Sequence, residues 1–452
     1  MTISVKLDGA QRHSDGLAAI TLDGPELKPV EVDLPFKSLL SSLGSPNPVA
    51  LDFLMIAGAC YVIDKATARK ATSDAWTRDL KVSFPVSDPK RWKKVASRLD
   101  AALTFLSGDV WRTSFHQAPC KLFVAPKKRR KKAPIPGEPD TFHAVTLFSG
   151  GLDSLIGTID YLKQNANNNL MLIGHYDAPG PKSQQLELYK QISARFPGRT
   201  KLVQVRVAQR PSKNTESSLR SRSIVFLGLG IYAASEIGTA APLLAPENGT
   251  IALNLPLTPS RGGSCSTRTM HPLYLEMLRS VLNQLGIGNS LINPLAPKTK
   301  GECVTECRDP KLVSLLAPHT VSCSHGSRRQ DWKRKSATNC GYCVPCLFRR
   351  ASLHAAKLDS GKDYGIDVCA DELKVDSDGT SADDLRAVTS GLRRFKDKET
   401  IRRAITSVAL VQPIDDYVGL VRRGLKELRS WITEKGSTSL RTAAGISDTT
   451  DA

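Results

Sequence analysis

The chain has 452 residues, of which 40% are hydrophobic and 24% are charged, a globular composition with room for roughly two or three domains. No apolar run is long enough to cross a membrane and the N-terminus has no apolar signal region, so we expect a cytoplasmic protein without a membrane partner. The formal net charge of +19 favours a nucleic acid, a nucleotide or an acidic protein as partner.

Residues 1–125 are predicted to form an α+β accessory domain. Alternating apolar and polar residues predict strands over residues 3–7, 78–86 and 109–117. Apolar residues at helical spacing predict helices over residues 47–68 and 88–108. Asp88 is placed to cap the second helix and Gly108 to end it. The segment shows no cluster of catalytic residue types, which favours a scaffold or a partner-docking role.

A basic, proline-rich run, PKKRRKKAPIPGEP, extends from residue 126 to residue 139. We interpret residues 126–140 as a linker, because proline-rich segments act as stiff spacers. The alternative for such a run is a nuclear signal or a patch that binds nucleic acid.

Strands and helices alternate over residues 141–370. Strands are predicted over residues 143–149, 169–176, 200–207 and 249–255. Helices are predicted over residues 153–164, 182–196, 216–238 and 272–286. This alternation is typical of an α/β fold with a parallel sheet, whose ligands bind beyond the carboxyl ends of the strands.

Residues 371–435 are predicted to be a helical extension. Apolar stripes among many Lys and Arg residues predict helices over residues 381–395, 398–411 and 414–435. The last segment, residues 436–452, is small and polar, and we expect it to be disordered.

A glycine-rich loop joins the first strand of the α/β region to its first helix. The sequence FSGGLDSLIG, residues 148–157, places two adjacent glycines between two apolar runs. Glycines let a backbone turn sharply and aim several N–H groups at one point, and the N-terminus of the following helix adds partial positive charge. We therefore predict an anion-binding loop made of Ser149, Gly150, Gly151, Leu152, Asp153 and Ser154.

The pattern Ser-Gly-Gly-x-Asp-Ser resembles the PP-loop of the ATP pyrophosphatases, which have the adenine-nucleotide α-hydrolase-like fold. It lacks the Gly-Lys-Ser/Thr signature of the Walker loop and the GxGxxG pattern of dinucleotide-binding folds. The resemblance implies that the loop grips the pyrophosphate of ATP while a nucleophile attacks the α-phosphorus. Asp153 would then help to place Mg²⁺ or hold the loop rigid, and its structural alternative is to cap the helix.

Four of the ten cysteines are spaced like metal ligands. Cys340, Cys343 and Cys346 form a C-x2-C-x2-C run, and Cys323 precedes it. Four thiolates close the coordination shell of a tetrahedral ion, so we predict a structural Zn²⁺ rather than a catalytic one. An iron–sulfur cluster is the minor alternative, and His325 is a candidate replacement for one ligand.

The loop and the cysteine cluster together resemble 7-cyano-7-deazaguanine synthase, the QueC family. The stretch SRSIVFLGLGIYAASEIG is similar to a family helix that begins Arg-Asn, with Arg222 and Ser223 in those places. NPLAPKTKGECV resembles the family stretch that brings Lys300 and Glu302. The resemblance covers roughly residues 142–357. The segments HYDAPGPKSQQ and PENGTIALNLPLTPSRGGSCSTRTMHP depart from the family pattern.

A long chain of this kind resembles the QueC-like components of bacterial antiviral defence, QatC of the Qat system and its relative in type IV CBASS. The resemblance implies a ligase that uses ATP to adenylate 7-carboxy-7-deazaguanine, or a related deazaguanine, and transfers it to an amine. The amine would belong to a partner protein encoded nearby, or to ammonia as in nitrile synthesis. Arg222 would contact a phosphate, and Ser149 and Asp153 would act beside it. The residues implied for the deazaguanine substrate are Glu247, Asn248, Arg261, Arg268, Thr269 and His271.

Two other functions are compatible with the same sequence. A tRNA-thiolating PP-loop enzyme would use the positive charge on RNA phosphates and needs a reactive cysteine, for which Cys265, Cys303 and Cys307 are candidates. A nucleotide-binding or nucleic-acid-binding subunit without activity would keep the loop as a relict. Thiouridine in bound tRNA would favour the first function, and unaltered ATP would favour the second.

Overall fold

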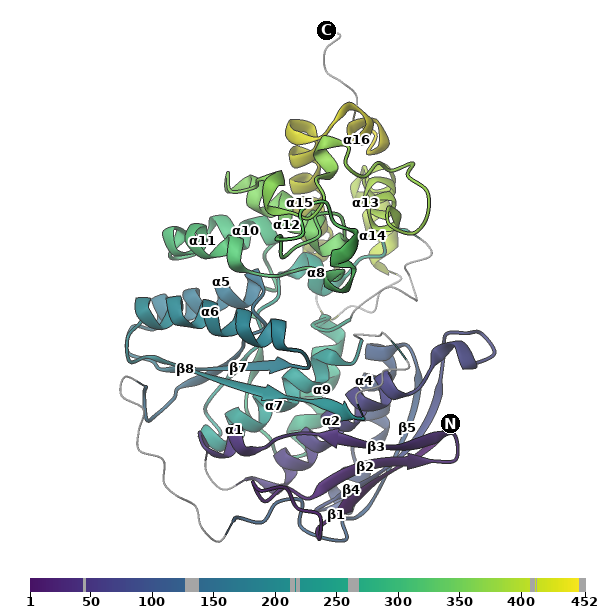
Figure 1. Ribbon diagram of the computed structural model, residues 1–452, viewed down its shortest axis with the longest axis vertical. Coiled ribbons are helices and arrows are strands. Elements are labelled where there is room, and N and C mark those ends of the chain that lie inside the picture. Colours follow the sequence, from purple (N-terminus) through teal and green to yellow (C-terminus); the bar gives the residue numbers. More distant parts are fainter. Residues whose placement is uncertain are drawn as a thin grey trace. The chain divides into compact units, whose positions relative to one another are not determined.

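The chain divides into two compact units. The computed structural model describes residues 1–43, 46–126, 138–211, 216, 220–258, 268–406, 411 and 413–446. The first unit comprises residues 1–149, 165–245 and 267–293, and the second unit comprises residues 150–164, 246–266 and 294–452. The α/β class, the parallel sheet and the helical C-terminal region that the sequence predicts are confirmed (Figure 1).

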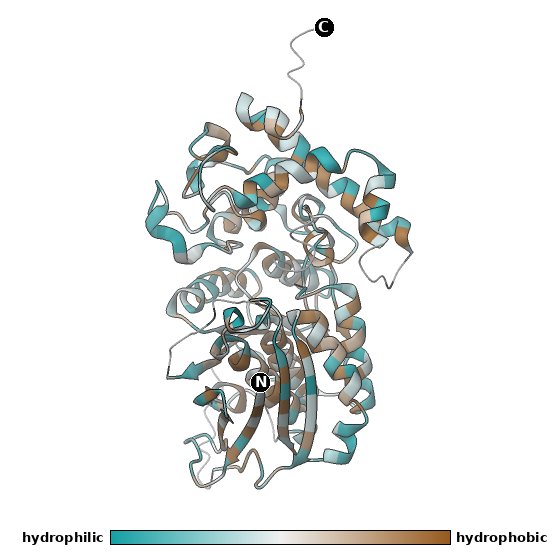
Figure 2. Cartoon of the chain, turned by 90° about the vertical axis from the view of Figure 1, so that its right-hand side faces the viewer, coloured by the Kyte–Doolittle hydropathy of each residue, from teal (hydrophilic) through white to brown (hydrophobic). Residues whose placement is uncertain are grey.

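A six-stranded mixed sheet lies in the first unit, in the order β5-β4-β1-β2-β3-β9 (Figure 1). β1 runs parallel to β4 and antiparallel to β2. Hydrophobic and hydrophilic residues alternate along its strands (Figure 2), as expected for a sheet with one covered face. The strands are β1 (Thr2–Asp8), β2 (Ala19–Gly24), β3 (Leu27–Asp33), β4 (Asp79–Val86), β5 (Val110–Gln117) and β9 (Ala208–Arg210).

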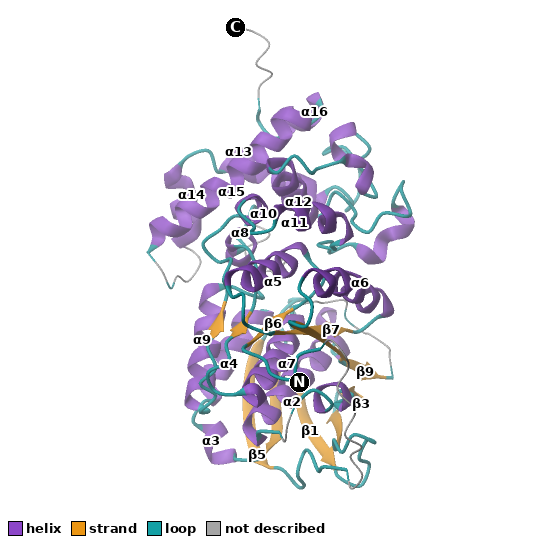
Figure 3. Ribbon diagram, turned by 90° about the vertical axis from the view of Figure 1, so that its left-hand side faces the viewer, coloured by secondary structure: helices purple, strands orange, loops and turns teal. Residues whose placement is uncertain are grey.

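The second sheet of the first unit has five strands in the order β11-β10-β6-β7-β8, and all its pairs are parallel. The chain runs from β6 to β7 and β8 on one side and then to β10 and β11 on the other. Figure 3 shows β6 and β7 side by side. The order therefore reverses between β6 and β10, where open α/β sheets bind ligands. The strands are β6 (Ala144–Leu147), β7 (Leu170–Tyr176), β8 (Thr200–Arg206), β10 (Leu243–Leu244) and β11 (Leu291–Ile292).

Two apolar helices join the two sheets into one core. α2 (Pro48–Ala66) packs on the mixed sheet, α7 (Arg222–Ile237) packs on the parallel sheet, and the two helices pack on each other. Gly228 of α7 allows this contact, because a Cβ atom there would lie 2.7 Å from the Cβ of Ala57. One hydrophobic core runs from Ile3 to Leu291, so the boundary predicted at residue 125 does not separate two cores.

Among the remaining helices of the first unit, those that begin after Asp88 and His271 have side-chain caps. Asp88 accepts a hydrogen bond from the amide of Arg91, and Gly108 ends the segment with a φ of +75°, as predicted. The predicted single helix over residues 88–108 is instead two helices. The helices are α1 (Lys37–Leu40), α3 (Pro89–Lys93), α4 (Ala96–Ser107), α6 (Pro179–Arg195), α9 (Pro272–Gln284) and the 3-10 helix η1 (Arg69–Ala71).

The second unit is helical in its described residues and has its own core, which includes Trp431, Leu428 and Leu392. Its α-helices are α5 (Leu152–Gln164), α8 (Gly249–Leu253), α10 (Lys300–Thr305), α11 (Pro310–Leu316), α12 (Val344–Ala355), α13 (Asp383–Arg394), α14 (Lys398–Thr406), α15 (Ile414–Lys435) and α16 (Thr438–Ala443). Its 3-10 helices are η3 (Ala317–His319), η4 (Gly326–Asp331), η5 (Gly361–Asp363) and η6 (Val368–Ala370).

The strand predicted over residues 249–255 is wrong, because Gly249–Leu253 form the short helix α8. The Asn248 side chain accepts a hydrogen bond from the amide of Ile251 and caps this helix. A short apolar run fits a strand or a buried helix equally well, so periodicity alone does not separate the two.

The expectation of a disordered tail from residue 436 is also wrong for its first part. Ser437 caps α16, and Leu440 and Ala444 are buried in the second core. Residues 447–452, like residues 127–137 of the predicted linker, lie outside the described residues. Within the described part of the chain, every helix is too short or too polar to span a membrane.

Candidate functional site

The glycine loop leaves the central strand of the parallel sheet, β6, at the point where the strand order reverses. Gly150 has a φ of +85°, a left-handed conformation that favours glycine. α5 begins at Leu152, and the Ser154 hydroxyl donates to the carbonyl of Gly151 at 2.9 Å. The first amides of a helix have no partner within the helix and carry partial positive charge. The predicted strand, loop and helix therefore occur in the predicted order.

Asp153, the second residue of α5, is held by two other segments of the second unit. Its Oδ1 accepts from the Nζ of Lys300 at 2.5 Å, and its Oδ2 accepts from the Nδ2 of Asn248 at 2.7 Å. Only 12% of the Asp153 side chain and 6% of the Lys300 side chain are exposed. Burial raises the pKa of Asp153, but Lys300 and Asn248 outweigh it and bring the pKa below its usual value. Asp153 is therefore a charged brace of the helix.

Lys300 is itself fixed by the cap of α10. Thr299 and Glu302 form a reciprocal capping box at the start of this helix. Glu427 of α15 accepts from the hydroxyl of Thr299 and from the amide of Gly301. The capping box and Glu427 thus hold the backbone at Lys300 in place, so that its side chain reaches Asp153. Lys300 belongs to the stretch that resembles the QueC family.

Gly157 and Pro246 form a second close contact in the same part of the second unit. A Cβ atom on Gly157 of α5 would lie 2.5 Å from the ring of Pro246, so α5 and the segment before α8 are in close contact. Both segments follow directly from the carboxyl ends of β6 and β10. The chain therefore brings the glycine loop and Asn248 together, although about a hundred residues separate them in the sequence.

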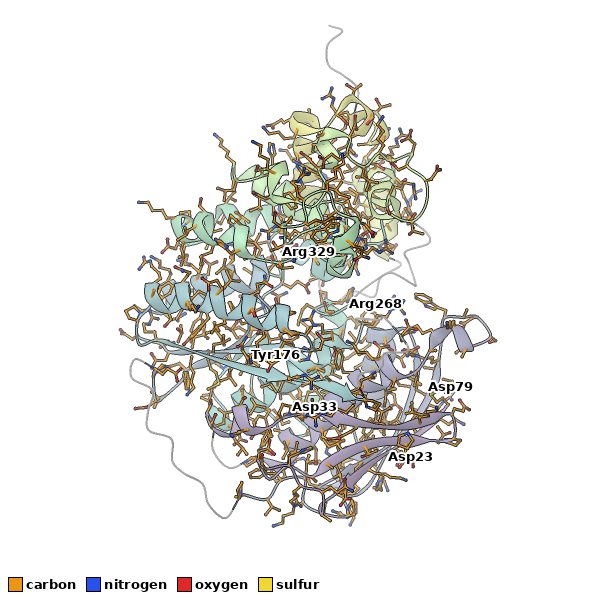
Figure 4. The ribbon with its side chains drawn as sticks, in the orientation of Figure 1. Asp23, Asp33, Asp79, Tyr176, Arg268 and Arg329 are labelled. Atoms are coloured by element: carbon orange, nitrogen blue, oxygen red, sulfur yellow. The ribbon has the colours of Figure 1, made fainter. Side chains whose placement is uncertain are left out.

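The residues implied for a deazaguanine belong to both units. The Asn248 side chain donates to Asp153 and accepts from the amide of Ile251, so both of its polar atoms have partners. Glu247, the residue before it, also belongs to the second unit. Arg268 and His271 lie in the first unit, and both contact the ring of Phe105 (Arg268 is labelled in Figure 4). Thr269 lies between them in sequence, and Arg261 lies outside the described residues.

Arg268 and His271 have structural partners. The Arg268 guanidinium lies 4.5 Å from the centre of the Phe105 ring and donates to the Phe105 carbonyl at 3.1 Å. His271 caps α9 by accepting from the amide of Leu273. Burial, with a smaller contribution from Arg268, lowers the pKa of His271 to about 4. These contacts engage both side chains, but the Nε2 of His271 is buried without a hydrogen-bond partner among the described residues.

Ser149 and Arg222 lie near the carboxyl end of β7, in the first unit. The Nε2 of Gln185 donates to the carbonyl of His175 at 3.1 Å and reaches the carbonyl of Ser149 at 3.5 Å. Gly174 makes room for this amide, because a Cβ atom there would lie 2.3 Å from the Oε1 of Gln185. Arg222 is the first residue of α7, and its charge helps to lower the pKa of His175.

Asp177, Tyr61 and Lys65 meet at this end of β7, although no sequence motif marks them as site residues. Asp177 accepts from the hydroxyl of Tyr61 and from the Nζ of Lys65, both at 2.7 Å. Tyr61 and Lys65 belong to α2, in the segment interpreted as an accessory domain. The stretch HYDAPGPKSQQ, which departs from the QueC pattern, contains Asp177 and Gln185 and is the one hint of an altered site.

The four predicted cysteine ligands come together in the second unit. The sulfur atoms of Cys323, Cys340, Cys343 and Cys346 all lie within 4.8 Å of one another, and this group can hold a metal ion. Backbone amides, including that of Cys343 at 3.2 Å, donate to the sulfur of Cys340, as expected for thiolate ligands. The set does not include His325, whose Nε2 lies 3.7 Å from a carboxylate oxygen of Asp384.

The cysteines nominated for tRNA thiolation do not have the properties of reactive thiols. Cys303 and Cys307 are buried. Burial raises the pKa of Cys303 well above its usual value and raises that of Cys307 to about 12. A nucleophilic cysteine needs the opposite, an accessible thiol with a lowered pKa. Cys265 lies outside the described residues.

Comparison with known proteins gives this chain no relative: no family model, no curated protein and no solved structure matches it.

Proposed function

We propose that the chain is a PP-loop ATP pyrophosphatase that adenylates 7-carboxy-7-deazaguanine, or a related deazaguanine, and passes the acyl group to an amine of a partner protein. The observation that carries the proposal is the Ser-Gly-Gly-Leu-Asp-Ser loop at the reversal point of the parallel sheet, followed by a helix that Asp153 and Lys300 brace. A braced helix N-terminus is a rigid anion site, and rigidity is what positions a phosphate for in-line attack.

The chemistry follows from the poor reactivity of a carboxylate. One carboxylate oxygen attacks the α-phosphorus of ATP, the bond to the β-phosphate oxygen breaks, and pyrophosphate leaves. The resulting acyl-adenylate reacts with an amine, which forms the amide bond, loses a proton and releases AMP. Mg²⁺, when bound, would neutralise the phosphate charge. Gly150, Gly151 and the first turn of α5 would hold the departing pyrophosphate, and both oxygens of Asp153 are already engaged as the brace.

The four cysteines would hold Zn²⁺ in a structural role. Four sulfur donors satisfy a tetrahedral ion and leave no position for a reacting molecule. The ion would fix the segment between Cys323 and Cys346, which carries buried Trp332. We assign it no step in the reaction.

The test is AMP release from ATP in the presence of 7-carboxy-7-deazaguanine. We expect Gly150→Ala to lose AMP formation, because a side chain is strained at its left-handed φ and alters the loop. Gly198→Ala is the matched control: its φ is +71° and its added Cβ atom would meet no other atom within 4 Å. Both variants should lose about 1–2 kcal/mol of stability. Equal AMP formation by the two variants, or none by the unaltered chain, would reject the proposal.

The acceptor is tested separately by mass spectrometry of proteins encoded beside this chain. A mass increase that matches a deazaguanine acyl group, absent when Gly150→Ala replaces the chain, would identify a protein acceptor. Free nitrile product without a protein adduct would instead indicate nitrile synthesis from ammonia.

A further inference from the structure

Side chains from α2 and α7 meet at the carboxyl end of β7. Asp177 receives hydrogen bonds from Tyr61 and Lys65 of α2, and 10% of the Lys65 side chain and 25% of the Asp177 side chain are exposed. Arg222 lies at the first position of α7 and contributes to lowering the pKa of Asp177, together with Lys65 and Tyr61 and against the effect of burial. All four residues belong to the first unit.

Three buried polar atoms here have no hydrogen-bond partner among the described residues: the Nε of Arg222, the Oγ of Ser223 and the Nδ1 of His175. Ser223 is 5% exposed and His175 is fully buried. The Nε2 of His175 lies 3.1 Å from the carbonyl of Val207 and carries the ring proton, so its Nδ1 is an acceptor and does not call for an anion. The Nε of Arg222 and the Oγ of Ser223 can donate. Buried polar groups are almost always paired, so these two unpaired atoms on neighbouring residues indicate a missing partner.

The charge of Arg222 favours an anion as this partner. Arg222 has no carboxylate within 4.0 Å in the described part of the chain, and it lies at the N-terminus of a 16-residue helix, where the helix dipole disfavours a cation. Arg222 lies near the ion pair of Lys65 with Asp177, and that pair is neutral by itself, so it does not match the charge of Arg222. His175 adds no charge at neutral pH, because burial lowers its pKa to about 4.

The nearby carboxylate of Asp64 does not balance the charge of Arg222 either. It binds the Ser221 hydroxyl before α7, but it also pairs with Arg78 at 2.6 Å and with Arg69 at 3.1 Å. Asp109 completes this buried group of two arginines and two aspartates. The group is neutral by itself and has no charge to offer Arg222.

Ser149, which belongs to the first unit, lies beside this cluster. Gln185 spans the carbonyls of His175 and Ser149, which places the two strand ends next to each other. Tyr176, labelled in Figure 4, is the last residue of β7. Ligands of parallel sheets bind at this edge.

We propose that Lys65, Arg222 and Ser223 form an anion-binding subsite at the carboxyl end of β7, which takes a phosphate or a carboxylate group. The N-terminal segment then supplies part of this subsite instead of serving only as a scaffold. The identity of the anion, a phosphate of ATP or the carboxylate of the deazaguanine, rests on the proposed function, and the existence of the subsite does not.

Direct binding to the full chain tests the subsite without any turnover. Inorganic phosphate should raise the unfolding temperature of the chain in a saturable way, and Arg222→Met or Lys65→Met should weaken this binding about tenfold or more by loss of a charge-assisted hydrogen bond. Asp177→Asn should bind phosphate more tightly, because it removes the competing carboxylate. Lys70→Met, at an exposed lysine of the same segment, is the matched control and should bind like the unaltered chain.

A double variant guards against loss of folding. Lys65→Met with Asp177→Asn removes both members of the ion pair, so no charge is left unpaired, and it should fold and still bind phosphate weakly. No phosphate effect in the unaltered chain, or equal binding by the Arg222, Lys65 and Lys70 variants, would overturn the proposal.

Calorimetry with Mg-ATP and with 7-carboxy-7-deazaguanine then identifies the anion. Weaker ATP binding by the Lys65 and Arg222 variants assigns a phosphate, and weaker deazaguanine binding assigns the carboxylate. If phosphate binding depends on these residues but no AMP is ever formed, the subsite stands and the proposed reaction fails.

Discussion

Asp153 shows how one residue can be found by a motif and have its role set by its neighbours. The loop pattern marks Asp153 as functional, with a choice between placing Mg²⁺ and holding the loop. Its two oxygens are bonded to Lys300 and Asn248, which favours the second role. No spacing rule links Asp153 to Lys300, because 147 positions separate them.

We expect Asp153→Ala and Lys300→Met to be far more harmful alone than together. Each single change leaves a buried charge without its partner, which costs about 3–5 kcal/mol, whereas the double change removes both charges. Urea unfolding at pH 7 of the single and double variants measures this coupling. Additive losses would show that the two side chains do not support each other.

Acid stability tests the structural role of His271. Its pKa in the folded chain is about 4, below the ordinary value of 6.5, so the unfolded chain takes up a proton first as the pH falls. Stability is therefore lost between pH 6.5 and pH 4, by about 3 kcal/mol for this group.

His271→Asn keeps a capping side chain but removes the titrating ring. We expect its unfolding free energy to fall less steeply over the same pH range than that of the unaltered chain, as measured by urea titrations at several pH values. His175, whose pKa is also about 4, stays in both chains and serves as the internal reference. If the unfolding free energy of both chains falls equally steeply with pH, His271 does not cause the loss of stability.

At the scale of elements, local signals predict well where a helix is long or capped. The caps Asn47 and Asp88 occur where the sequence predicts helix starts. The wrong predictions concern short elements. α8 has five residues, and its apolar sequence also fits a strand. α16 lies in a segment of polar composition and is stabilised by burial of Leu440. Tertiary contacts outweigh local preference in such short elements.

The cysteine segment is the element whose stability should depend on a bound ion. Chelation under reducing conditions should release zinc and make residues 321–370 sensitive to protease, because metal binding supplies folding free energy to such sites. Cys346→Ser should lose the ion, whereas Cys369→Ser, in the same unit but outside the cluster, should retain it. Metal analysis measures the bound zinc, and timed proteolysis measures the protease sensitivity of this segment. Retention of zinc by Cys346→Ser would contradict the assignment.

At the scale of the whole molecule, the two units do not follow the order of the chain. The N-terminal sheet and the parallel sheet share one core through the contact of α2 with α7. Residues 1–125 are therefore an integral part of this core. This arrangement explains how Lys65, which lies in a segment without a catalytic motif, reaches Asp177.

Deletion of residues 1–125 should therefore prevent folding instead of leaving a smaller enzyme. The deletion exposes the buried face of α7, and apolar surface loses about 25 cal/mol per Å² on exposure. Solubility and cooperative unfolding of the truncated chain, compared with a chain that lacks only residues 447–452, measure the effect. A soluble, cooperatively folded truncation would show that the N-terminal segment is separable.

The sequence by itself determined the features that depend on spacing along the chain: the alternation of strands and helices, the glycine loop and the four cysteine ligands. Each of these is local, because a turn, a helix cap or a pair of metal ligands needs only a few neighbouring residues. The tertiary structure alone decided that Lys300 braces Asp153 and that α2 brings Lys65 to Arg222 and Asp177. Those meetings depend on strand order and helix packing, which join residues far apart in sequence and leave no periodic mark on it.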